Sequence, residues 1–478
     1  MNLSMILEMV ANNGERAVAT VGDRSLTATD LDTHARHLAA RVRGSSAVLY
    51  LGTNHLAYPV ALFGAALAGV PFVPLNYRLG DQQLSALIDR HPGATILRQD
   101  DLDALLDHAP DDADQAELEP QWDGDAIAAI IYTSGTTSDP KPAVLRHRHV
   151  IAYVLNTMEF ASAEESDASL VSVPPYHIAG LTNLISNLYS GRRIVYLSAF
   201  EPATWLETVR REEVVHAMLV PTMLARIVAH LGSEDANVPT LATLAYGGSR
   251  TPRPVLEHAL RAFPTTGFVN AYGLTETASS VAVLGPDDHR EAIASDDPAV
   301  RDRLGSVGRP LPGIEIEIRT ESDEPVATGE TGLIFVRGEQ ISGEYGGRSV
   351  LDAEGWFSTR DLGHLDADGY VYVEGRSDDT IIRGGENIAP AEIEDVLLAH
   401  PAIVEAAVIG VSDAEWGQRI VAVLVGDADP DEVRQWVKDR LRSSKTPDTI
   451  VFRHELPKTE TGKLLRRTLL AELENQNA

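Results

Sequence analysis

Cysteine is absent from this sequence of 478 residues, which excludes disulfide bonds, thiolate metal sites and a cysteine nucleophile at once. The formal net charge of −30 argues against nucleic acid or an anionic membrane as a partner. The longest apolar run, residues 60–75, contains two prolines and two glycines and is too short to span a bilayer. Because the first residues also lack the basic segment of a signal peptide, the sequence predicts a cytoplasmic globular protein with no membrane span.

Lysine is scarce as well. The chain has five lysines against thirty-five arginines, an imbalance that a GC-rich genome would explain. Three of the five, Lys445, Lys458 and Lys463, lie close together near the C-terminus, and Lys141 follows a glycine-containing loop. Where arginine is the usual cation, a lysine suggests a need for a compact and mobile point charge.

The first third of the chain alternates helical and strand-like segments. Residues 29–42 have helical spacing behind two possible capping residues, Thr27 and Thr29. Such alternation predicts a largely parallel, doubly wound sheet, and a second α/β stretch follows at residues 149–271. Residues 101–125 are acidic and rich in turn formers, which predicts a solvated connector.

From residue 305 to 372 the pattern changes to short strands punctuated by glycine, which predicts a small antiparallel, β-barrel-like unit. A compact α+β tail follows, and the domain boundary is expected at Ser377/Asp378. The expected fold class is α/β. An N-terminal domain of residues 1–377 would hold the doubly wound sheets and the β-barrel-like unit, and residues 378–478 would form a smaller, mobile α+β domain.

The segment at residues 133–141 has the composition of a phosphate-binding loop, and it follows a short apolar run typical of a buried strand. Glycine and small hydroxyl residues let backbone N–H groups surround an anion, and a following lysine can offset its charge. It is not a Walker A loop, because no second glycine precedes the lysine and no serine or threonine follows it. The candidate phosphate-binding residues are Thr133, Ser134, Gly135, Thr136, Thr137 and Lys141.

Three more motifs follow in order along the chain. They are Tyr272-Gly273-Leu274-Thr275-Glu276, then Thr359-Arg360-Asp361 with Gly375-Arg376 further on, and Thr461-Gly462-Lys463 near the C-terminus. Together with the loop at residues 133–141, they resemble the acyl-adenylate-forming superfamily, which includes acyl- and aryl-CoA synthetases, adenylation domains of peptide synthetases and beetle luciferase. The resemblance covers nearly the whole chain, from about residue 26 to residue 467.

This resemblance implies ATP-dependent activation of a carboxylic acid to an acyl-adenylate, followed by transfer to CoA that gives acyl-CoA, AMP and pyrophosphate. The expected cofactors are ATP and Mg²⁺, with CoA as co-substrate. Because the carboxylate must attack another anion, the α-phosphate, positioning and electrostatics supply most of the catalysis. The expected partner is a small, apolar carboxylic acid, and the oligomeric state stays open.

The resemblance also assigns the nucleotide contacts. Thr275 would contact the α-phosphate, and Glu276 with Thr133 would hold Mg²⁺, a hard cation suited to oxygen ligands. Tyr272 would stack on adenine, Asp361 would accept hydrogen bonds from both ribose hydroxyls, and Arg376 would reach the ribose or the phosphates. The rest of the expected nucleotide site consists of Gly248, Ser249, Asn270, Ala271 and Gly273.

The segment around His177 resembles the border of the acyl pocket, where this histidine would lie near the carboxylate and the thiol entrance. Peptide-synthetase domains commonly have an aspartate in this region to pair with an amino group, so Tyr176-His177 argues against an α-amino acid. An apolar pocket with room in it is expected, and aromatic and aliphatic acids both remain open. Its expected lining is Tyr176, His177, Ile178, Gly180, Gly247, Gly248, Ala271 and Gly273.

Lys463 would contact the carboxylate and the α-phosphate during adenylation, whereas Lys458 is expected to be structural. By resemblance, the C-terminal domain then rotates about a hinge at Asp378. After rotation, Gly384, Gly385 and Glu386 would line the tunnel that admits the thiol. The catalytic residues would be Lys463, Glu276, Thr275 and His177.

Two alternatives remain open. The acceptor could be the phosphopantetheine arm of an acyl carrier protein instead of CoA. The protein could instead be a non-catalytic nucleotide-binding homologue. This alternative rests on Ser138 and Pro142, which stand where glycine is usual in the family's phosphate loop, and proline removes one N–H donor.

Overall fold

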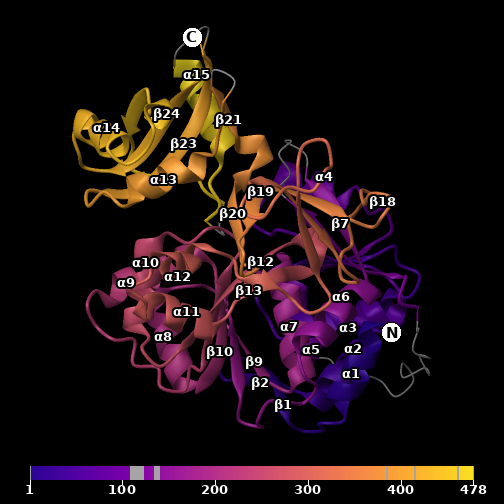
Figure 1. Ribbon diagram of the computed structural model, residues 1–478. Helices are drawn as coiled ribbons and strands as arrows, with labels where there is room; N and C mark the ends of the chain where they lie inside the picture. The colour runs from indigo at the N-terminus through magenta and orange to yellow at the C-terminus, as the bar shows by residue number, and fades with distance from the viewer. Residues whose placement is uncertain are drawn as a thin grey trace.

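A computed structural model describes residues 2–107, 123–133, 140–383, 386–413, 416–459 and 462–476. Two large sheets and their helices make up most of the molecule, and a smaller C-terminal domain lies over one end of them (Figure 1). This mixed α/β architecture confirms the predicted fold class.

The first sheet has nine strands. In spatial order these are β14 (Arg309–Pro310), β13 (Ser279–Leu284), β12 (Gly267–Leu274), β11 (Thr243–Gly247), β10 (Val214–Leu219), β8 (Ala168–Val171), β9 (Arg193–Tyr196), β1 (Ala17–Val21) and β2 (Arg24–Thr27). The strands from β12 to β1 pair in parallel, and β2, β13 and β14 are antiparallel additions at the edges. Ligands bind beyond the carboxyl ends of parallel strands in such sheets, which directs attention to the ends of β11 and β12.

The second sheet has seven strands. In spatial order these are β18 (Arg348–Ser349), β17 (Glu344–Tyr345), β7 (Lys141–Arg146), β6 (Ile127–Thr133), β4 (Phe72–Pro74), β3 (Val48–Leu51) and β5 (Thr95–Arg98). β6 and β7 are antiparallel, and Thr133 at the end of one pairs with Lys141 at the start of the other. The predicted phosphate loop therefore joins two paired strands.

Helices pack between the sheets and on their outer faces. One apolar core takes side chains from both sheets and from α1 (Leu3–Ala11), α2 (Ala28–Val42), α3 (Ala57–Ala68), α5 (Gln99–Asp107), α6 (His147–Thr157) and α7 (Ile178–Ser190). A second core joins the nine-stranded sheet to α8 (Pro202–Arg211), α9 (Pro221–Leu231), α10 (Arg253–Ala262) and α11 (Pro286–Ala294), with short α12 (Pro298–Asp302) alongside. α4 (Asp81–Ile88) packs against the seven-stranded sheet.

The helices α2 and α5 test two local predictions, the capping residue of the first and the start of the acidic connector after the second. Thr27, not Thr29, caps α2: its hydroxyl accepts from the Asp30 N–H at 3.0 Å, and the Asp30 carboxylate accepts from the Thr27 N–H. The acidic connector begins later than predicted, because α5 continues to Asp107. Leu102 and Leu105 lie one helical turn apart and are buried in the core. Their burial stabilises the helix although the surrounding residues are acidic.

The small antiparallel unit has four strands in the order β15 (Glu315–Arg319), β16 (Gly332–Arg337), β19 (Phe357–Leu365) and β20 (Val371–Arg376). Its two end strands do not pair with each other, so it is an open sheet where a barrel-like unit was expected. Its importance lies in β19 and β20, which carry Asp361 and Arg376.

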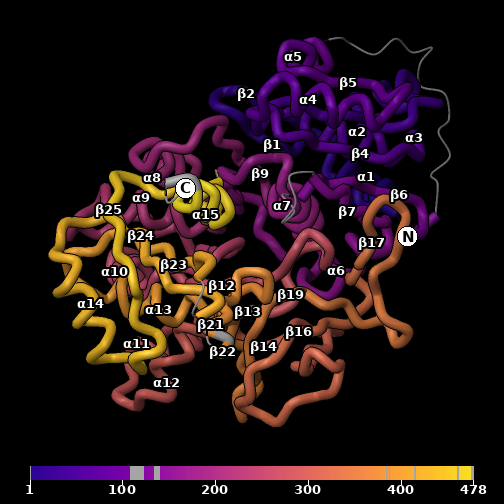
Figure 2. The backbone as a smooth tube through the Cα atoms, turned by 90° about the horizontal axis from the view of Figure 1, so that it is seen from above, coloured from indigo at the N-terminus to yellow at the C-terminus, as the bar shows by residue number. Residues whose placement is uncertain are grey.

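The C-terminal domain follows the turn η4 (Ser377–Asp379). A short hairpin precedes a three-stranded sheet, with helices on both faces: β21 (Ile381–Arg383), β22 (Glu386–Ile388), β23 (Ile403–Asp413), β24 (Gly417–Gly426), β25 (Thr449–Phe452), α13 (Pro390–Leu398), α14 (Pro430–Lys438) and α15 (Arg466–Gln476). Figure 2 shows this domain over the side of the large domain that contains α9 to α12. Within the described part of the chain, no helix combines the length and apolar character needed to cross a membrane.

Candidate active site

The Tyr-Gly-Leu-Thr-Glu motif spans the carboxyl end of β12 and the turn η2 that follows it. Gly273 has no alternative there, because a Cβ atom would lie 1.9 Å from the Ser279 carbonyl oxygen. The buried Thr277 hydroxyl accepts from the Leu274 N–H at 2.9 Å and holds the turn η2 (Thr275–Thr277) closed. Ala278 and Ser279 then adopt positive φ angles of 51° and 113°, a strained backbone of the kind that tertiary contacts must hold in place.

Two predicted nucleotide residues converge on the carboxylate of a third, Asp361. The Tyr272 hydroxyl donates to Asp361 Oδ2 at 2.6 Å, and Arg376 lies 3.2 Å from Asp361 Oδ1. Arg376 and Asp361 face each other in the register of β20 and β19, which explains their separation in the sequence. The structure thus brings together Tyr272, Asp361 and Arg376 as the sequence predicted.

Asp361 is 4% exposed. Burial raises the pKa of its carboxyl, and Arg376, the Tyr272 hydroxyl and Lys463 act in the opposite direction. Burial, followed by the charge of Asp361, also raises the pKa of Tyr272 well above its ordinary value. A buried acceptor with one tyrosine and one arginine beside it can take hydrogen bonds from ligand hydroxyls.

Glu276 is 7% exposed and accepts a short hydrogen bond from the Tyr345 hydroxyl. Tyr345 lies in β17 and pairs with Ala143 of β7, so this bond connects the motif after β12 to the strand that follows the phosphate loop. Burial, and then the charge of Glu276, raise the pKa of Tyr345. A buried carboxylate near a phosphate loop suits Mg²⁺, which prefers one or two carboxylates together with phosphate oxygens.

Lys463 reaches this site from the C-terminal domain. Its N–H donates to the Thr459 hydroxyl at 3.0 Å, in a turn where Gly462 has a φ of 79°. A Cβ atom on Gly462 would lie 2.0 Å from Thr222 Cγ2 of α9, so the turn packs directly on the large domain. Glycine is required twice over, by the backbone angle and by this contact.

The charge of Lys463 interacts with the nucleotide site. Part of its side chain remains exposed, yet desolvation lowers the pKa of the ammonium group, and Arg376 acts in the same direction. Asp361, Asp379 and Glu276 oppose this shift. Lys463 therefore lies within electrostatic reach of Arg376, Asp361 and Glu276. Lys458 instead forms an ion pair with Glu405 at 2.5 Å within its own domain.

The segment predicted to border the acyl pocket is anchored at the start of α7. His177 occupies the N-cap position and is half-buried, with its ring centroid 4.6 Å from that of Tyr176. Tyr176 in turn makes an edge-to-face contact with Tyr77 at 5.7 Å. Ile178 and Ala179 pack partly against the core.

Two predicted pocket glycines are required by close packing of the backbone. A Cβ atom on Gly247 would lie 2.2 Å from the Ala271 carbonyl oxygen, and one on Gly180 would lie 2.9 Å from the Pro174 carbonyl oxygen. Gly247 allows β11 and β12 to approach, and Gly180 allows α7 to begin beneath the two prolines. Gly248 differs, because it is exposed and has a φ of 88°.

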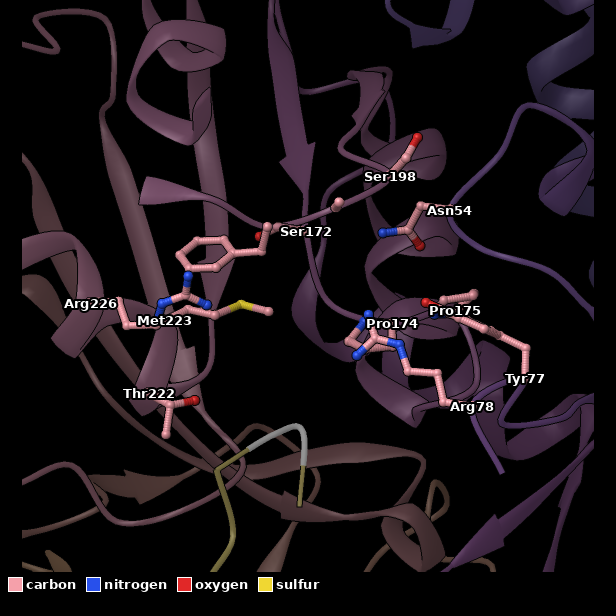
Figure 3. A pocket seen from close by; sticks show the side chains of 12 residues that line it. Asn54, Tyr77, Arg78, Ser172, Pro174, Pro175, Ser198, Thr222, Met223 and Arg226 are labelled. Atoms are coloured by element: carbon pink, nitrogen blue, oxygen red, sulfur yellow. The ribbon is translucent and has the colours of Figure 1, made fainter. Parts of the chain in front are cut away.

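A cavity of about 140 Å³ opens on the other side of the two prolines (Figure 3). Arg78 and Arg226 extend toward it from opposite walls, and Thr222, which the Gly462 turn contacts, lies at its edge. Arg226 is already paired with Glu201 at 3.2 Å. None of the residues that line the cavity is among those predicted for the acyl pocket. The cavity is lined by Asn54, Tyr77, Arg78, Ser172, Pro174, Pro175, Ser198, Ala199, Phe200, Thr222, Met223 and Arg226.

The contacts described above do not include every predicted site residue. Ser134, Gly135, Thr136 and Thr137 of the phosphate loop, and Gly384 and Gly385 of the predicted tunnel, lie outside the described residues. Glu386 forms an ion pair with Arg442 at 2.6 Å within the C-terminal domain. The Thr133 hydroxyl donates to the Lys141 carbonyl at 3.3 Å, and Asn270 donates to the Ser306 carbonyl at 3.1 Å.

Two residues of the site were not predicted. Tyr345 stands in a Gly-Glu-Tyr-Gly-Gly stretch, and this glycine-rich turn around an aromatic residue was the available signal. Arg360 precedes Asp361 with a φ of 61°, an unusual backbone for a side chain of its size. Arg360 lies inside the Thr359-Arg360-Asp361 motif, and nothing in that motif indicated its unusual backbone angle.

Comparison with known proteins agrees with this geometry. The family model described as AMP-binding enzyme matches residues 7–345, and the model of the AMP-binding enzyme C-terminal domain matches residues 392–463. The chain belongs to the AMP-binding enzyme family. The resemblance inferred from the motifs is therefore confirmed.

Relatives of this AMP-binding enzyme align over nearly their whole length. A feruloyl-CoA synthase of Amycolatopsis sp. is 35% identical over 93% of both chains, and a 2-succinylbenzoate–CoA ligase of Bacillus licheniformis is 33% identical over 95% of this chain and 96% of that one. The o-succinylbenzoate CoA synthetase of Bacillus subtilis, solved with its acyl-adenylate intermediate, is 28% identical over 98% of both chains with a TM-score of 0.85. The same synthetase, solved with ATP and a magnesium ion, is 29% identical over 98% of this chain and 99% of that one with a TM-score of 0.83.

Proposed function

We propose that this AMP-binding enzyme activates an aromatic carboxylic acid and transfers its acyl group to CoA. The general reaction is that of an AMP-forming acyl-CoA synthetase, with ATP and Mg²⁺ as cofactors and CoA as co-substrate. The acid's carboxylate oxygen attacks the α-phosphate and pyrophosphate leaves, and the thiol of CoA then displaces AMP. The observation that carries the proposal is the convergence of Tyr272, Asp361, Arg376 and Glu276 with Lys463.

The proposed roles follow from charge and position. Asp361 would accept from the ribose hydroxyls, Arg376 would lie at the ribose or the phosphates, and Lys463 would stabilise negative charge on the carboxylate and α-phosphate as they react. Glu276, with Thr133, would hold Mg²⁺, which when bound neutralises phosphate charge. Ser138 and Pro142 stand where glycine is usual in the family, but the residues with the roles proposed above are all present in the sequence. A non-catalytic homologue therefore has little support.

An aromatic acid is favoured by two observations. The relatives described above are named for feruloyl and succinylbenzoyl groups, and the segment carrying His177 presents Tyr176 and Tyr77 in edge-to-face contact. Aromatic side chains arranged in this way suit a ring of the substrate. The proposed compartment is the cytoplasm, where both ATP and CoA are available.

CoA, instead of a carrier protein, is the acceptor that the cavity favours. Arg78 and Arg226 extend toward it from opposite walls, and two guanidinium groups can bind phosphates in a protein of net charge −30. Replacing both with alanine should raise the KM for CoA while leaving pyrophosphate exchange intact. An increase in the KM for the acid, with loss of exchange, would instead assign the cavity to the acyl substrate.

The deciding experiment is a screen of carboxylic acids for CoA-dependent AMP release. Cinnamates, benzoates and arylacetates should be active, and fatty acids of similar size should be poor substrates. Preference for aliphatic acids would overturn the substrate class and leave the reaction in place. AMP release that requires a carrier protein and does not occur with CoA would overturn the acceptor.

A further inference from the structure

One ion pair joins the large domain to the C-terminal domain beside the nucleotide site. The guanidinium of Arg250 donates to the carboxylate of Asp395 in α13. Arg250 comes two residues after Gly248, in the connection between β11 and α10 that also carries Ser249. Figure 1 and Figure 2 both show α13 next to α10, the helix that follows this connection.

Asp395 depends on this arginine for its counter-charge. The two other acidic residues of α13 have partners within their own domain, in the pairs Glu392–Lys445 and Glu394–Arg466. Burial raises the pKa of Asp395, and its two acidic neighbours act in the same direction, whereas Arg250 opposes them. Loss of Arg250 would leave Asp395 beside like charges in the present domain orientation.

Contacts within the C-terminal domain link the helix that carries Asp395 to the turn that carries Lys463. Arg466 lies 2.6 Å from Glu394 of α13 and 3.4 Å from Asp379 in the turn η4. Arg466 begins α15, three residues after Lys463. Because these contacts connect α13, the proposed hinge and the lysine turn, a restraint on Asp395 also restrains Lys463.

We propose that Arg250 is a positioning residue for adenylate formation, whose ion pair with Asp395 favours the domain orientation that brings Lys463 to the nucleotide. This inference rests on the proposed two-step function. Rotation of the C-terminal domain about Asp378 would carry Asp395 away from Arg250, so the pair belongs to the first half-reaction alone.

The test is a charge swap measured on both half-reactions. Arg250→Glu and Asp395→Arg should each lower pyrophosphate exchange, and the double variant with both changes should recover it. Exposed ion pairs contribute little individually, so the expected loss is up to about fivefold and should shrink as salt is added. Thioester formation from supplied acyl-adenylate and CoA should stay at the wild-type rate or rise, and the KM for ATP should stay unchanged.

Arg253→Glu is the matched control. Arg253 is similarly exposed and pairs with Glu257 and Asp302, all within the large domain, so its reversal should not separate the half-reactions. The proposal is overturned if the double variant shows no recovery, or if both half-reactions fall equally in the single variants. A wild-type enzyme inactive in both half-reactions would refute the proposed function, whereas an active wild type with unchanged variants would refute only the role of Arg250.

A distance measurement gives an outcome that does not depend on the substrate. Because the chain has no cysteine, Ala229→Cys in α9 and Asp431→Cys in α14 can carry spin labels without removing any native thiol. The wild type should show a population at the distance of the present orientation. Arg250→Glu should reduce that population and the double variant should restore it; an unchanged distribution would reject the proposal.

Discussion

At the scale of single residues, the site gathers positive charge around a buried acid. Arg376 contributes to lowering the pKa of Lys463, so the two cations repel each other when no anion lies between them. Phosphate groups would remove that repulsion and favour the ammonium form. An acidic protein thereby obtains a local site for anionic substrates without a favourable overall field.

Lys463→Ala should abolish most adenylate formation. Removing one well-placed donor from an anionic transition state costs about 3 kcal/mol, or 100-fold or more in rate. Thioester formation from supplied acyl-adenylate should survive, because the lysine is proposed to act only in the first step. Lys458→Ala is the control and should keep pyrophosphate exchange. Wild-type exchange in Lys463→Ala would refute the assignment.

Asp361→Asn should weaken ATP binding without loss of stability. The folded pKa of Asp361 is raised by burial, so the folded state holds its proton more tightly than the unfolded state. Wild-type stability should therefore fall as pH rises from about 3.9, the ordinary value for aspartate, to the raised value. The variant cannot titrate, so its advantage in unfolding free energy should grow over that range and then stay level.

Chemical denaturation of both proteins at a series of pH values, without nucleotide, measures this difference. A variant that became less stable than the wild type as pH rises would contradict the burial argument. Glu276→Gln provides a second comparison: it should weaken Mg²⁺-dependent use of ATP while the melting temperature changes little.

At the scale of elements, the sequence predicted local motifs better than it predicted the contacts between distant segments. The turn after β12 and the lysine turn were predicted because glycine and hydroxyl residues mark tight turns locally. The hydrogen bond between Tyr345 of β17 and Glu276 of the turn η2 was not predicted, because the two residues are 69 positions apart in the sequence. Arg146 and Glu344 pair within one sheet, yet they are 198 positions apart and were not predicted either.

Gly462→Ala should impair adenylation through a single methyl group. The new Cβ atom would meet Thr222 at 2.0 Å, and the φ of 79° adds about 1 kcal/mol or more of backbone strain for a residue with a side chain. Adding Thr222→Ala removes the closest atoms and should recover part of the activity. The measurement is pyrophosphate exchange in the three variants, including Thr222→Ala alone; full activity in Gly462→Ala would show that this contact does not form during adenylation.

At the scale of the whole molecule, the arrangement of the two domains was the part that sequence could predict least. Family resemblance implied two orientations, but nothing in the residue pattern selects one of them. The structure holds the orientation with Lys463 at the nucleotide residues, through the packing of Gly462 on Thr222 and the pair between Arg250 and Asp395. Such contacts join distant residues by charge and shape and leave no periodic signal.

The proposed hinge lies where few contacts resist rotation. Asp378 is exposed in η4, and Arg360 Nη1 lies 4.0 Å from its carboxylate. Two long hydrogen bonds span the turn: the Thr380 N–H donates to the Ser377 carbonyl and the Thr380 hydroxyl donates to the Arg376 carbonyl, each at 3.3 Å. A short segment of this kind can absorb the dihedral changes of a domain rotation.

Asp378→Pro should separate the two half-reactions. Proline fixes its own φ and restricts Ser377 before it, yet it is compatible with the first turn of a short helix such as η4. The present orientation should therefore persist, with pyrophosphate exchange retained and acyl-CoA production reduced by a much larger factor. Asp378→Ala, which removes the carboxylate near Arg360 but leaves the backbone free, should keep both activities. Equal loss of both in the proline variant would indicate general damage, and loss of neither would place the hinge elsewhere.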